Sequence, residues 1–412
     1  MSGRIHTLGD SHNFGRRVVE RDGRICKPRT VFWEWLLLCA DSPLRVLLDG
    51  MAPVVGDGRV RFDFLPHLRF GTSGAGLDGA GGLSGEVERI SLQPLQIASA
   101  SDRRQLAEVT GRAIALFSWL GLGDLHWENM ALGADTNGRV IFAPLDIELL
   151  LDDHDLPTAT RLLPEADPDY AALYQHACGV RRVLPFLGKP LAIADLLAMT
   201  RAYCQTLAVL DQHSDSIAAT LSALPGVRQA PLRVCLRSTG DYLRPRAQLD
   251  PPLLAAEIEQ LDRGDIPYFF RLYGRPGIHY FRDASLATSG RLPGRGDVPQ
   301  LAPLLSLSKG LRSSSRRALR EQGLFCLLSA FDHPRFTGEH TLADLRVRFT
   351  AHSLNVRLPG AEELETRRDL REHVSSVYLP CECGEVASPL VPRVTRCQIV
   401  RPAPTSAAET RP

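Results

Sequence analysis

The chain has 412 residues, of which 44% are hydrophobic, and this is enough to bury the core of two or three domains. Its formal net charge of +1 gives no electrostatic reason to expect nucleic acid or an anionic membrane as the main partner. No apolar run reaches the roughly 18 residues of a membrane-spanning helix, and the first residues contain no apolar core of a signal peptide. We therefore expect a globular cytoplasmic protein that spans no membrane and binds no nucleic acid.

A β-hairpin is predicted near the start of the chain. The segment RRVVERDGRICKPR (residues 16–29) places two β-prone runs around Asp22-Gly23, a dipeptide typical of a two-residue hairpin turn. This prediction puts Lys27 on the second strand. A helix is expected directly afterwards, over TVFWEWLLLCA (residues 30–40). The glycine-rich residues 71–85 are too flexible to contribute a core element.

The next predicted helix begins near Ser101, which is a candidate N-cap. The polar stretch GDLHWENM (residues 123–130) follows this helix at once. A second hairpin is expected around Asn137-Gly138, and its second strand leads into the acidic motif PLDIELL (residues 144–150). The helix is predicted from apolar residues at helical spacing, which are Leu106, Val109, Ala113, Leu116, Phe117 and Leu120.

Helical patterns follow over residues 170–184 and 193–210, and PLRVCLRST (residues 231–239) has the pattern of a strand. A further helix is expected over residues 250–261, with Asp250 as its N-cap and Pro251 in its first turn. In the last part of the chain we predict strands within residues 323–331 and 343–352. Residues 401–412 have the composition of a disordered tail.

The nine cysteines are odd in number and mostly occur singly in apolar segments, which is typical of reduced, buried thiols. Cys381, Cys383 and Cys397 are the one group that resembles a metal cluster. The paired C-x-x-C spacing of most structural zinc sites is missing there, so a zinc site is the less favoured interpretation.

The side chains needed for phosphoryl transfer from ATP occur in the expected order along the chain. Lys27, on an early strand, is a candidate contact for phosphate groups, and Asp124 is a candidate partner of the attacking hydroxyl. Asn129, Asp146 and Glu148 carry the oxygen ligands that Mg²⁺ prefers. Each residue alone also fits a loop cap, a surface lysine or a solvent-facing strand. Their joint order favours a phosphotransferase.

Four stretches of the chain, within about residues 9–285, together resemble the dehydratase domain of class II lanthipeptide synthetases (LanM type). The resemblance implies an α+β fold with a kinase-like (lipid-kinase-like), two-lobed core and a C-terminal extension. Residues 1–100 would form the nucleotide-binding region, 101–285 the catalytic and elimination region, and 286–400 the extension. The four stretches are GDSHNFGRRVVERDGRICKPR (residues 9–29), GDLHWENMALG with VIFAPLDIELL (123–133 and 140–150), RVCLRST (233–239) and EIEQLDRGDIPYF (257–269).

That family uses ATP and Mg²⁺ to phosphorylate Ser or Thr of a ribosomally made precursor peptide. It then eliminates the phosphate to leave dehydroalanine or dehydrobutyrine. The resemblance implies that Lys27 and Arg29 contact ATP and that Asp124 acts on the substrate hydroxyl. Asn129 and Asp146 would hold Mg²⁺, with Glu148 beside them.

The resemblance also implies a second set of residues, for the elimination step. Arg233 would neutralise the departing phosphate, because a guanidinium binds such a group in a bidentate way, and Thr239 would hydrogen-bond it. A histidine is an attractive base because its pKa lies near working pH. The sequence leaves open which of several cleft residues is that base, and the candidates are Asp10, His12, His126 and Glu148.

The sequence departs from the family pattern at Ser238, where proline is usual, and at Leu149, where threonine is usual. The family's tyrosine-glycine-tryptophan stretch has no clear counterpart, and neither its preceding region nor its zinc-dependent cyclase domain is found. We therefore expect dehydration without ring formation, and a separate cyclase or other tailoring enzyme as a partner. The alternatives are a small-molecule phosphotransferase of the aminoglycoside type, which shares a G-D-L-H loop, and a pseudokinase that binds a peptide or a partner enzyme.

Overall fold

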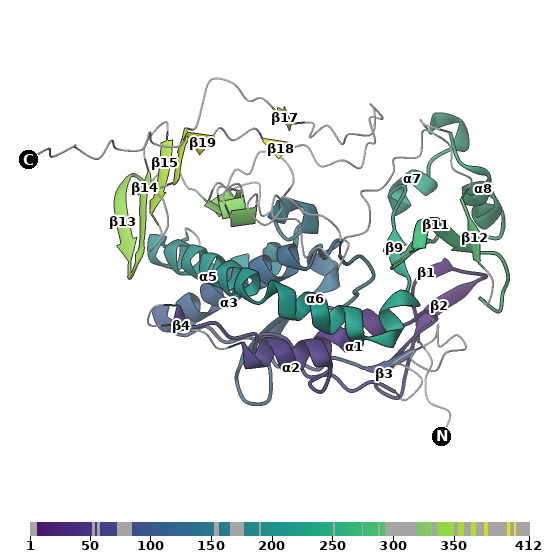
Figure 1. The fold of residues 1–412 in the computed structure, drawn as a ribbon, viewed down its shortest axis with the longest axis horizontal. Helices are drawn as coiled ribbons and strands as arrows, with labels where there is room; N and C mark the ends of the chain where they lie inside the picture. Colours follow the sequence, from purple (N-terminus) through teal and green to yellow (C-terminus); the bar gives the residue numbers. More distant parts are fainter. Residues whose placement is uncertain are drawn as a thin grey trace, which may run out of the picture.

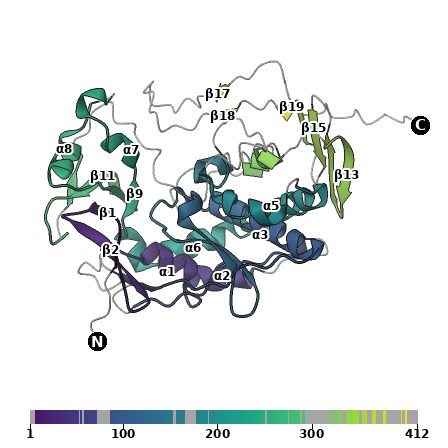
Figure 2. The same ribbon diagram turned by 180° about the vertical axis from the view of Figure 1, so that it is seen from behind.

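The protein has a mixed α+β fold of helices and small antiparallel sheets (Figures 1 and 2), as the sequence predicts at this level. The kinase-like, two-lobed arrangement stays a prediction. No helix among the described residues is long and apolar enough to cross a membrane. The computed structural model describes residues 6–51, 54–55, 58–71, 85–151, 156–164, 177–188, 191–249, 252–273, 275–286 and 289–292, with shorter stretches between 319 and 400.

The N-terminal sheet has the strand order β1-β2-β3-β6. The predicted hairpin is confirmed, because Asp22 and Gly23 both have positive φ, 53° and 73°, as a two-residue turn of this kind requires. Lys27 ends its second strand and pairs with Gly85. The strands are β1 (His6–His12), β2 (Arg16–Arg21), β3 (Arg24–Lys27) and β6 (Gly85–Glu88), and a separate small hairpin joins β4 (Val54–Val55) to β5 (Gly58–Arg59).

Two short helices follow the sheet, α1 (Phe32–Leu38) and α2 (Pro43–Gly50). The first lies within the predicted range of residues 30–40. Ser42 caps α2, since its side chain accepts a hydrogen bond from the Arg45 backbone N–H. Residues 72–84, most of the glycine-rich segment, lie outside the described part of the chain.

The long helices α3 (Ala100–Trp119) and α5 (Ile193–Gln212) pack side by side in the middle of the molecule (Figures 1 and 2). The predicted N-cap of α3, Ser101, is wrong by two residues. Ser99 is the cap, because Asp102, three residues after it, completes a capping box. Gly111 lets the two helices approach closely, as a Cβ there would lie 2.1 Å from the Met199 carbonyl oxygen.

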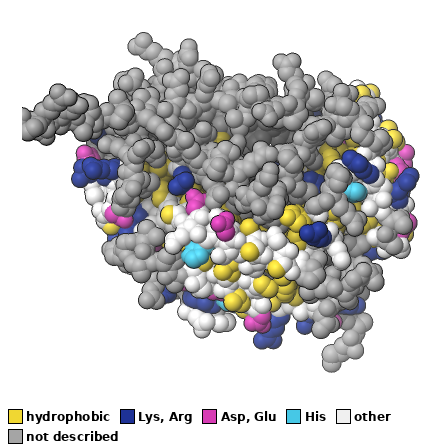
Figure 3. Space-filling view, in the orientation of Figure 1, with side chains coloured by type: hydrophobic (Ala, Val, Ile, Leu, Met, Phe, Trp, Pro, Cys, Tyr) yellow, Lys and Arg dark blue, Asp and Glu magenta, His cyan; other side chains and the backbone are white. Residues whose placement is uncertain are grey.

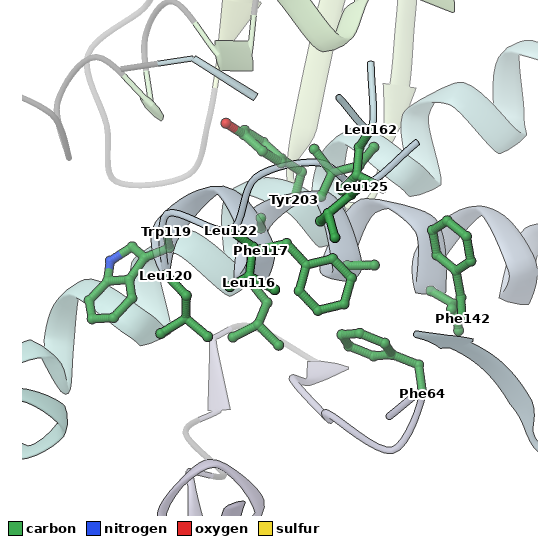
Figure 4. Close-up of a cluster of buried hydrophobic side chains, with 14 of the residues drawn as sticks. Phe64, Leu116, Phe117, Trp119, Leu120, Leu122, Leu125, Phe142, Leu162 and Tyr203 are labelled. Atoms are coloured by element: carbon green, nitrogen blue, oxygen red, sulfur yellow. The ribbon is translucent and has the colours of Figure 1, made fainter. Parts of the chain in front are cut away.

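The main core surrounds these two helices, and Figure 4 shows part of it. Phe64 and Phe117 meet nearly at right angles, with ring centroids 6.1 Å apart. The backbone N–H of Phe142 donates to the Phe64 carbonyl, so the strand before the acidic motif is anchored to the same core. All six apolar residues predicted to face the core from the α3 segment are buried.

The predicted second hairpin is confirmed as β7 (Met130–Ala134) and β8 (Val140–Pro144), with Gly138 at positive φ in its turn. The 3₁₀ helix η1 (Trp127–Asn129) precedes it. Of the predicted helix over residues 170–184, residues 170–176 lie outside the described part. The described remainder of that range is not one continuous helix, because it forms η4 (Gly179–Arg182) and the start of α4 (Leu184–Leu187). The 3₁₀ helix η2 (Pro157–Thr160) lies earlier in the chain.

A second sheet, of order β12-β11-β10-β9, lies beside β1 and β2 at one end of the molecule (Figures 1 and 2). Its strands are β9 (Leu232–Val234), β10 (Phe269–Leu272), β11 (Arg275–Phe281) and β12 (Ser289–Arg291). Before this sheet in the chain, α6 (Ser214–Ala223) contacts α2 and α5, and η5 (Pro225–Arg228) follows it. Between β9 and β10 come α7 (Thr239–Tyr242), η6 (Arg246–Gln248) and α8 (Ala255–Asp262).

The predicted start of the last of these helices is wrong. Asp250 and Pro251 lie outside the described residues, and α8 begins only at Ala255, with Leu254 as its N-cap. The Glu257 carboxylate fixes this start, because it accepts a hydrogen bond of 2.7 Å from the Leu254 N–H.

The third sheet lies at the opposite end of the molecule (Figure 1). The prediction of a strand within residues 343–352 is confirmed, whereas the predicted strand at 323–331 is wrong. The described residues there are helical, and Leu324, Leu327, Leu328 and Phe331 recur at helical spacing and are buried. Cys381, Cys383, Cys397 and the tail lie outside the described residues. The sheet contains β13 (Gly338–Leu342), β14 (Leu345–Phe349), β15 (Ser353–Arg357), β16 (Leu364–Arg367) and β19 (Ile399–Val400), and β17 (Ser375–Val377) pairs with β18 (Val394–Thr395).

Figure 3 shows that hydrophobic side chains gather on one face, around the position of α2 and α6. Val46 of α2 is 58% exposed and contributes to the exposed apolar surface. Among the described residues of α2 and α6, Val46 is the one large hydrophobic side chain that is exposed, and a single residue of this kind is normal for a protein surface, so we assign this face no role.

Candidate active site

Lys27 lies at the end of β3 and is almost fully buried. Its Nζ is 2.6 Å from Asp146 Oδ1 and 2.9 Å from Glu34 Oε1, and it donates a third hydrogen bond to the Leu145 carbonyl at 3.2 Å. Burial opposes the charge of Lys27, but the two carboxylates outweigh it and raise the lysine pKa. The lysine is therefore a fixed cation in the interior.

Arg29 follows two residues later and contacts three carboxylates. Its Nη2 lies 2.5 Å from Glu34 Oε1 and also contacts Asp146, while its Nε lies 2.5 Å from Glu148 Oε1. Burial again opposes the charge, and Glu148, Glu34 and Asp146 more than compensate, so the pKa of Arg29 is raised well above its usual value. Arg29 thus bridges the acidic motif and helix α1.

Asp146 and Glu148 extend from the segment after β8, on either side of the buried Ile147. Burial would raise the pKa of Asp146, yet Lys27 and Arg29 hold it well below its usual range. Both Glu148 carboxylate oxygens are occupied, since Oε1 pairs with Arg29 and Oε2 accepts from Arg233 Nη1 at 2.9 Å. Three cations therefore face three carboxylates, which compensates charges that would be costly to bury singly.

Arg233 comes from β9, far along the sequence, and is held in place twice by Glu148. Besides the side-chain pair, its backbone N–H donates to the Glu148 carbonyl at 3.0 Å. Its guanidinium carbon lies 5.4 Å from the centre of the Tyr268 ring, a cation–π distance. The sequence motif that contains Arg233 is therefore joined directly to the acidic motif.

Asp124 lies in the loop after α3, with a left-handed backbone φ of 58°. The Asn129 side-chain amide donates to the Asp124 carbonyl at 2.9 Å, and Arg161 Nη1 lies 3.0 Å from Asp124 Oδ1. Burial raises the pKa of Asp124, against the opposing charges of Arg161, His126 and Arg233. The predicted pair Asp124 and Asn129 thus forms one hydrogen-bonded loop.

The two predicted histidines are held differently. His126 caps η1, because its Nδ1 accepts from the Glu128 N–H at 3.3 Å. His12 Nδ1 lies 2.8 Å from the Ile266 carbonyl oxygen, and since a carbonyl only accepts, this nitrogen carries the proton. Nε2 of the neutral His12 ring therefore keeps its lone pair. Burial lowers the pKa of His12, and Arg233 lowers it further.

Two predicted residues lie at the margin of this arrangement. Asp10 is exposed on β1, two residues before His12. Thr239 is exposed at the first position of α7, whose N-cap is Ser238. Arg237 of the same motif is buried against Glu257, at 3.0 Å, and so supports the fold locally.

Sequence reasoning missed Glu34 and Arg161. Glu34 had a usable signal, because it is the one charged residue in the apolar run VFWEWLLLC (residues 31–39), where a buried charge needs a partner. No signal in the sequence indicates Arg161. The turn that places it beside Asp124 depends on contacts between distant segments, such as the hydrogen bond from the Leu125 N–H to the Thr160 carbonyl.

The fit of Mg²⁺ can be tested on the oxygen atoms present. Asn129 Oδ1 and Asp146 Oδ2 form no hydrogen bond with another described residue, so both can serve a hard cation. Glu148 has both oxygens paired with guanidinium groups. Within the described chain, no three His, Cys, Asp or Glu side chains gather as a metal site. Mg²⁺ is usually held by few protein ligands together with substrate phosphates.

A polar cavity of about 390 Å³ lies apart from these residues. Two of its basic side chains have acidic partners, since Arg45 pairs with Asp49 at 2.9 Å and Arg139 with Asp135 at 2.7 Å. Arg61, His67 and Asp63 also line it, so its walls carry side chains of both signs.

The residues that converge are thus a lysine, two arginines, an oriented histidine, an aspartate beside an asparagine, and an acidic pair in which Glu148 is 12% and Asp146 38% exposed. Such a set can bind phosphate groups, hold one divalent cation and move protons at two separate bases. No protein-family model matches the sequence, and no curated protein is similar enough to be a relative.

Proposed function

We propose that this protein is an ATP-dependent dehydratase of Ser or Thr in a ribosomally made precursor peptide. The observation that carries the proposal is the 2.9 Å contact between Arg233 and Glu148. It brings a guanidinium from a distant strand into the ion cluster of Lys27 and Asp146. A phosphotransferase needs the lysine and the acids, and the additional arginine supports a second step in which phosphate leaves.

The proposed nucleotide region is kinase-like. Its support is the position of Lys27 on the third strand of an antiparallel sheet, with the loop of Asp124 and Asn129, a hairpin and then Asp146 later in the chain. Protein kinases place a lysine on the third strand and magnesium ligands after the catalytic loop in this order.

When bound, ATP with Mg²⁺ would supply the phosphoryl group of the first step. Lys27 and Arg29 would contact its phosphate oxygens, and Asn129 and Asp146 would provide oxygens for the cation. Asp124 takes the proton of the peptide hydroxyl as that oxygen bonds to the γ-phosphorus. The bond between this phosphorus and ADP breaks at the same time.

Binding of the nucleotide requires an exchange of partners. Lys27 and Arg29 contact the Asp146 carboxylate in the structure. When the nucleotide binds, both side chains would contact its phosphate oxygens as well, and the cation would bind the Asp146 carboxylate. Opposite charges are therefore kept paired throughout, which avoids the cost of an isolated buried charge.

In the second step His12 Nε2 removes the α-proton of the phosphorylated residue. The electron pair of that C–H bond forms the Cα=Cβ double bond, the Cβ–O bond breaks, and phosphate leaves with its electrons toward Arg233. The lowered pKa of His12 keeps the ring neutral and able to accept a proton near pH 7. Capping of η1 by His126 makes it the weaker candidate for this base.

The test is to co-express the protein with a precursor peptide encoded beside it and to weigh the product by mass spectrometry. Loss of one water per modified residue supports the dehydratase. A retained phosphate identifies a kinase without elimination. An unchanged peptide, with no ATP hydrolysis or phosphorylation by purified protein, contradicts the proposal and favours a pseudokinase.

A further inference from the structure

The turn between β1 and β2 has an unusual backbone. Asn13, Phe14 and Gly15 all have positive φ, at 49°, 69° and 77°. A turn that directs neighbouring backbone N–H groups into one concavity is called a nest, and such a concavity binds anions. Here the anion is a carboxylate of the same chain, because the N–H groups of Phe14 and Gly15 donate to Asp265 Oδ2 and Oδ1 at 2.7 and 2.9 Å.

Asp265 lies in the loop between α8 and β10 and is 1% exposed. It also accepts a hydrogen bond from Ser11 Oγ at 2.8 Å, so it holds the turn by three bonds. Arg263 covers the contact, with its guanidinium 4.0 Å from the Phe14 ring centre and its Nε 3.6 Å from Asp265 Oδ2. Despite burial, these donors lower the pKa of Asp265, so it is charged at neutral pH.

The same tether extends to His12. The N–H of Ile266 donates to the Ser11 carbonyl at 2.8 Å, and the Ile266 carbonyl accepts from His12 Nδ1. The following strand, β10, pairs with β9 so that Phe270 lies opposite Arg233. Residue 266, just before β10, therefore holds His12 next to the sheet that carries Arg233 on β9.

We propose that Asp265 is a positioning residue for the elimination step, which ties the β1–β2 turn to β10 and thereby aims His12 at the substrate beside Arg233. This inference rests on the proposed dehydratase function. The same proposal assigns the β1–β2 turn to the elimination step and not to nucleotide binding. The N–H groups of the nest already donate to Asp265, so they are not available to a nucleotide phosphate.

The substitution Asp265→Asn tests this role with little change in shape. An amide offers one acceptor oxygen, so at least one backbone N–H of the turn would face an NH₂ donor. We expect phosphorylation of the peptide to continue, which also reports that the variant folds. Elimination should slow by up to roughly a hundredfold, as misplaced reacting groups do, so phosphopeptide accumulates.

The matched control is Asp262→Asn, three residues earlier, where the carboxylate is 58% exposed and pairs with Arg246 on the surface. It should eliminate phosphate at the wild-type rate. Ser11→Ala removes one of the three bonds to Asp265 and should slow elimination by a smaller factor. Elimination at the wild-type rate in Asp265→Asn would overturn the proposal.

A second measurement does not depend on activity. ¹⁵N NMR of the histidine rings at pH 8, with the His12 signals assigned by comparison with His12→Gln, reports which ring nitrogen carries the proton. Wild type should show Nδ1–H alone for His12, and Asp265→Asn a mixture of both forms. An unchanged His12 tautomer contradicts the inference even if wild type proves inactive, whereas inactivity of wild type alone contradicts only the proposed function.

Discussion

Arg233 and Asp146 belong to one ion cluster but to different proposed steps, so single substitutions should separate the steps. Arg233→Ala removes the charge that receives the leaving phosphate and should trap phosphopeptide. Asp146→Asn removes a proposed ligand of Mg²⁺ and should leave the peptide unmodified. Mass spectrometry of the peptide after co-expression distinguishes the two products. Normal dehydration by Arg233→Ala would refute the role given to this arginine.

Arg161 should lower the pKa of Asp124, the proposed base of the phosphorylation step. Asp124 must be ionised to take a proton, burial raises its pKa, and Arg161, at 3.0 Å, is the largest opposing influence. Arg161→Gln should therefore raise that pKa further and move the acidic limb of the phosphorylation rate to higher pH.

The measurement is kcat/KM for phosphorylation as a function of pH, and Arg161→Lys serves as the control because it keeps the charge. A purely structural role would lower the rate equally at all pH values. An acidic limb at the same pH in wild type and Arg161→Gln would rule out this influence on Asp124.

At the scale of elements, the contact of α3 with α5 depends on one glycine. In Gly111→Ala the new Cβ would lie 2.1 Å from the Met199 carbonyl, so the helices must move apart. We expect the free energy of unfolding to fall by about 1–3 kcal/mol, the usual cost of overpacking, although alanine favours a helix more than glycine.

Urea denaturation followed by circular dichroism measures this change. Gly50→Ala is the control, because a Cβ at the end of α2 would meet no atom within 4 Å. If Gly111→Ala is as stable as wild type, the close helix contact is not a constraint on the fold.

The elements differ in how far the sequence predicts them. Both hairpins followed from Asp22-Gly23 and Asn137-Gly138, because such dipeptides favour a hairpin turn. The first is a two-residue turn, whereas the second loop is longer, since Ala134 pairs with Val140. The helix at 323–331 was mistaken for a strand, since a short apolar run has no period that separates the two. The start of α3 was missed because Ser99 and Ser101 are both acceptable caps, and the position of Asp102 decides between them.

The candidate site shows the same limit. Lys27, Asp124, Asn129 and Asp146 were named from their order along the chain, and Arg233 from the resemblance of its motif to a known family. Their ion pairs were not, because each pair joins segments whose approach is set by tertiary packing. The exposed position of Thr239 also depends on where α7 begins, which local sequence does not reveal.

At the scale of the whole molecule, the ion cluster joins α1, β3, the segment after β8, and β9. Glu34→Gln keeps the shape but leaves Lys27 and Arg29 short of one charge partner. We expect the free energy of unfolding to fall by roughly 3–5 kcal/mol, as for other broken buried ion pairs.

Asp262→Asn is the control, since its carboxylate is 58% exposed and pairs with Arg246 on the surface. It should change the free energy of unfolding by about 0–1 kcal/mol. Urea unfolding curves of both variants give the comparison. Equal effects from the two substitutions would show that burial of the cluster adds nothing to stability.

The bond between Ser11 and Asp265 spans 254 positions of the sequence. During synthesis the ribosome releases the β1–β2 turn early, while its carboxylate partner is still far from being translated. The nest, the orientation of His12 and the pairing of Arg29 with Glu148 must therefore wait for later parts of the chain. The β1–β2 hairpin is thus made before its partner and completed late, so the elimination proposed for His12 cannot begin on a nascent chain that has not yet released Ile266.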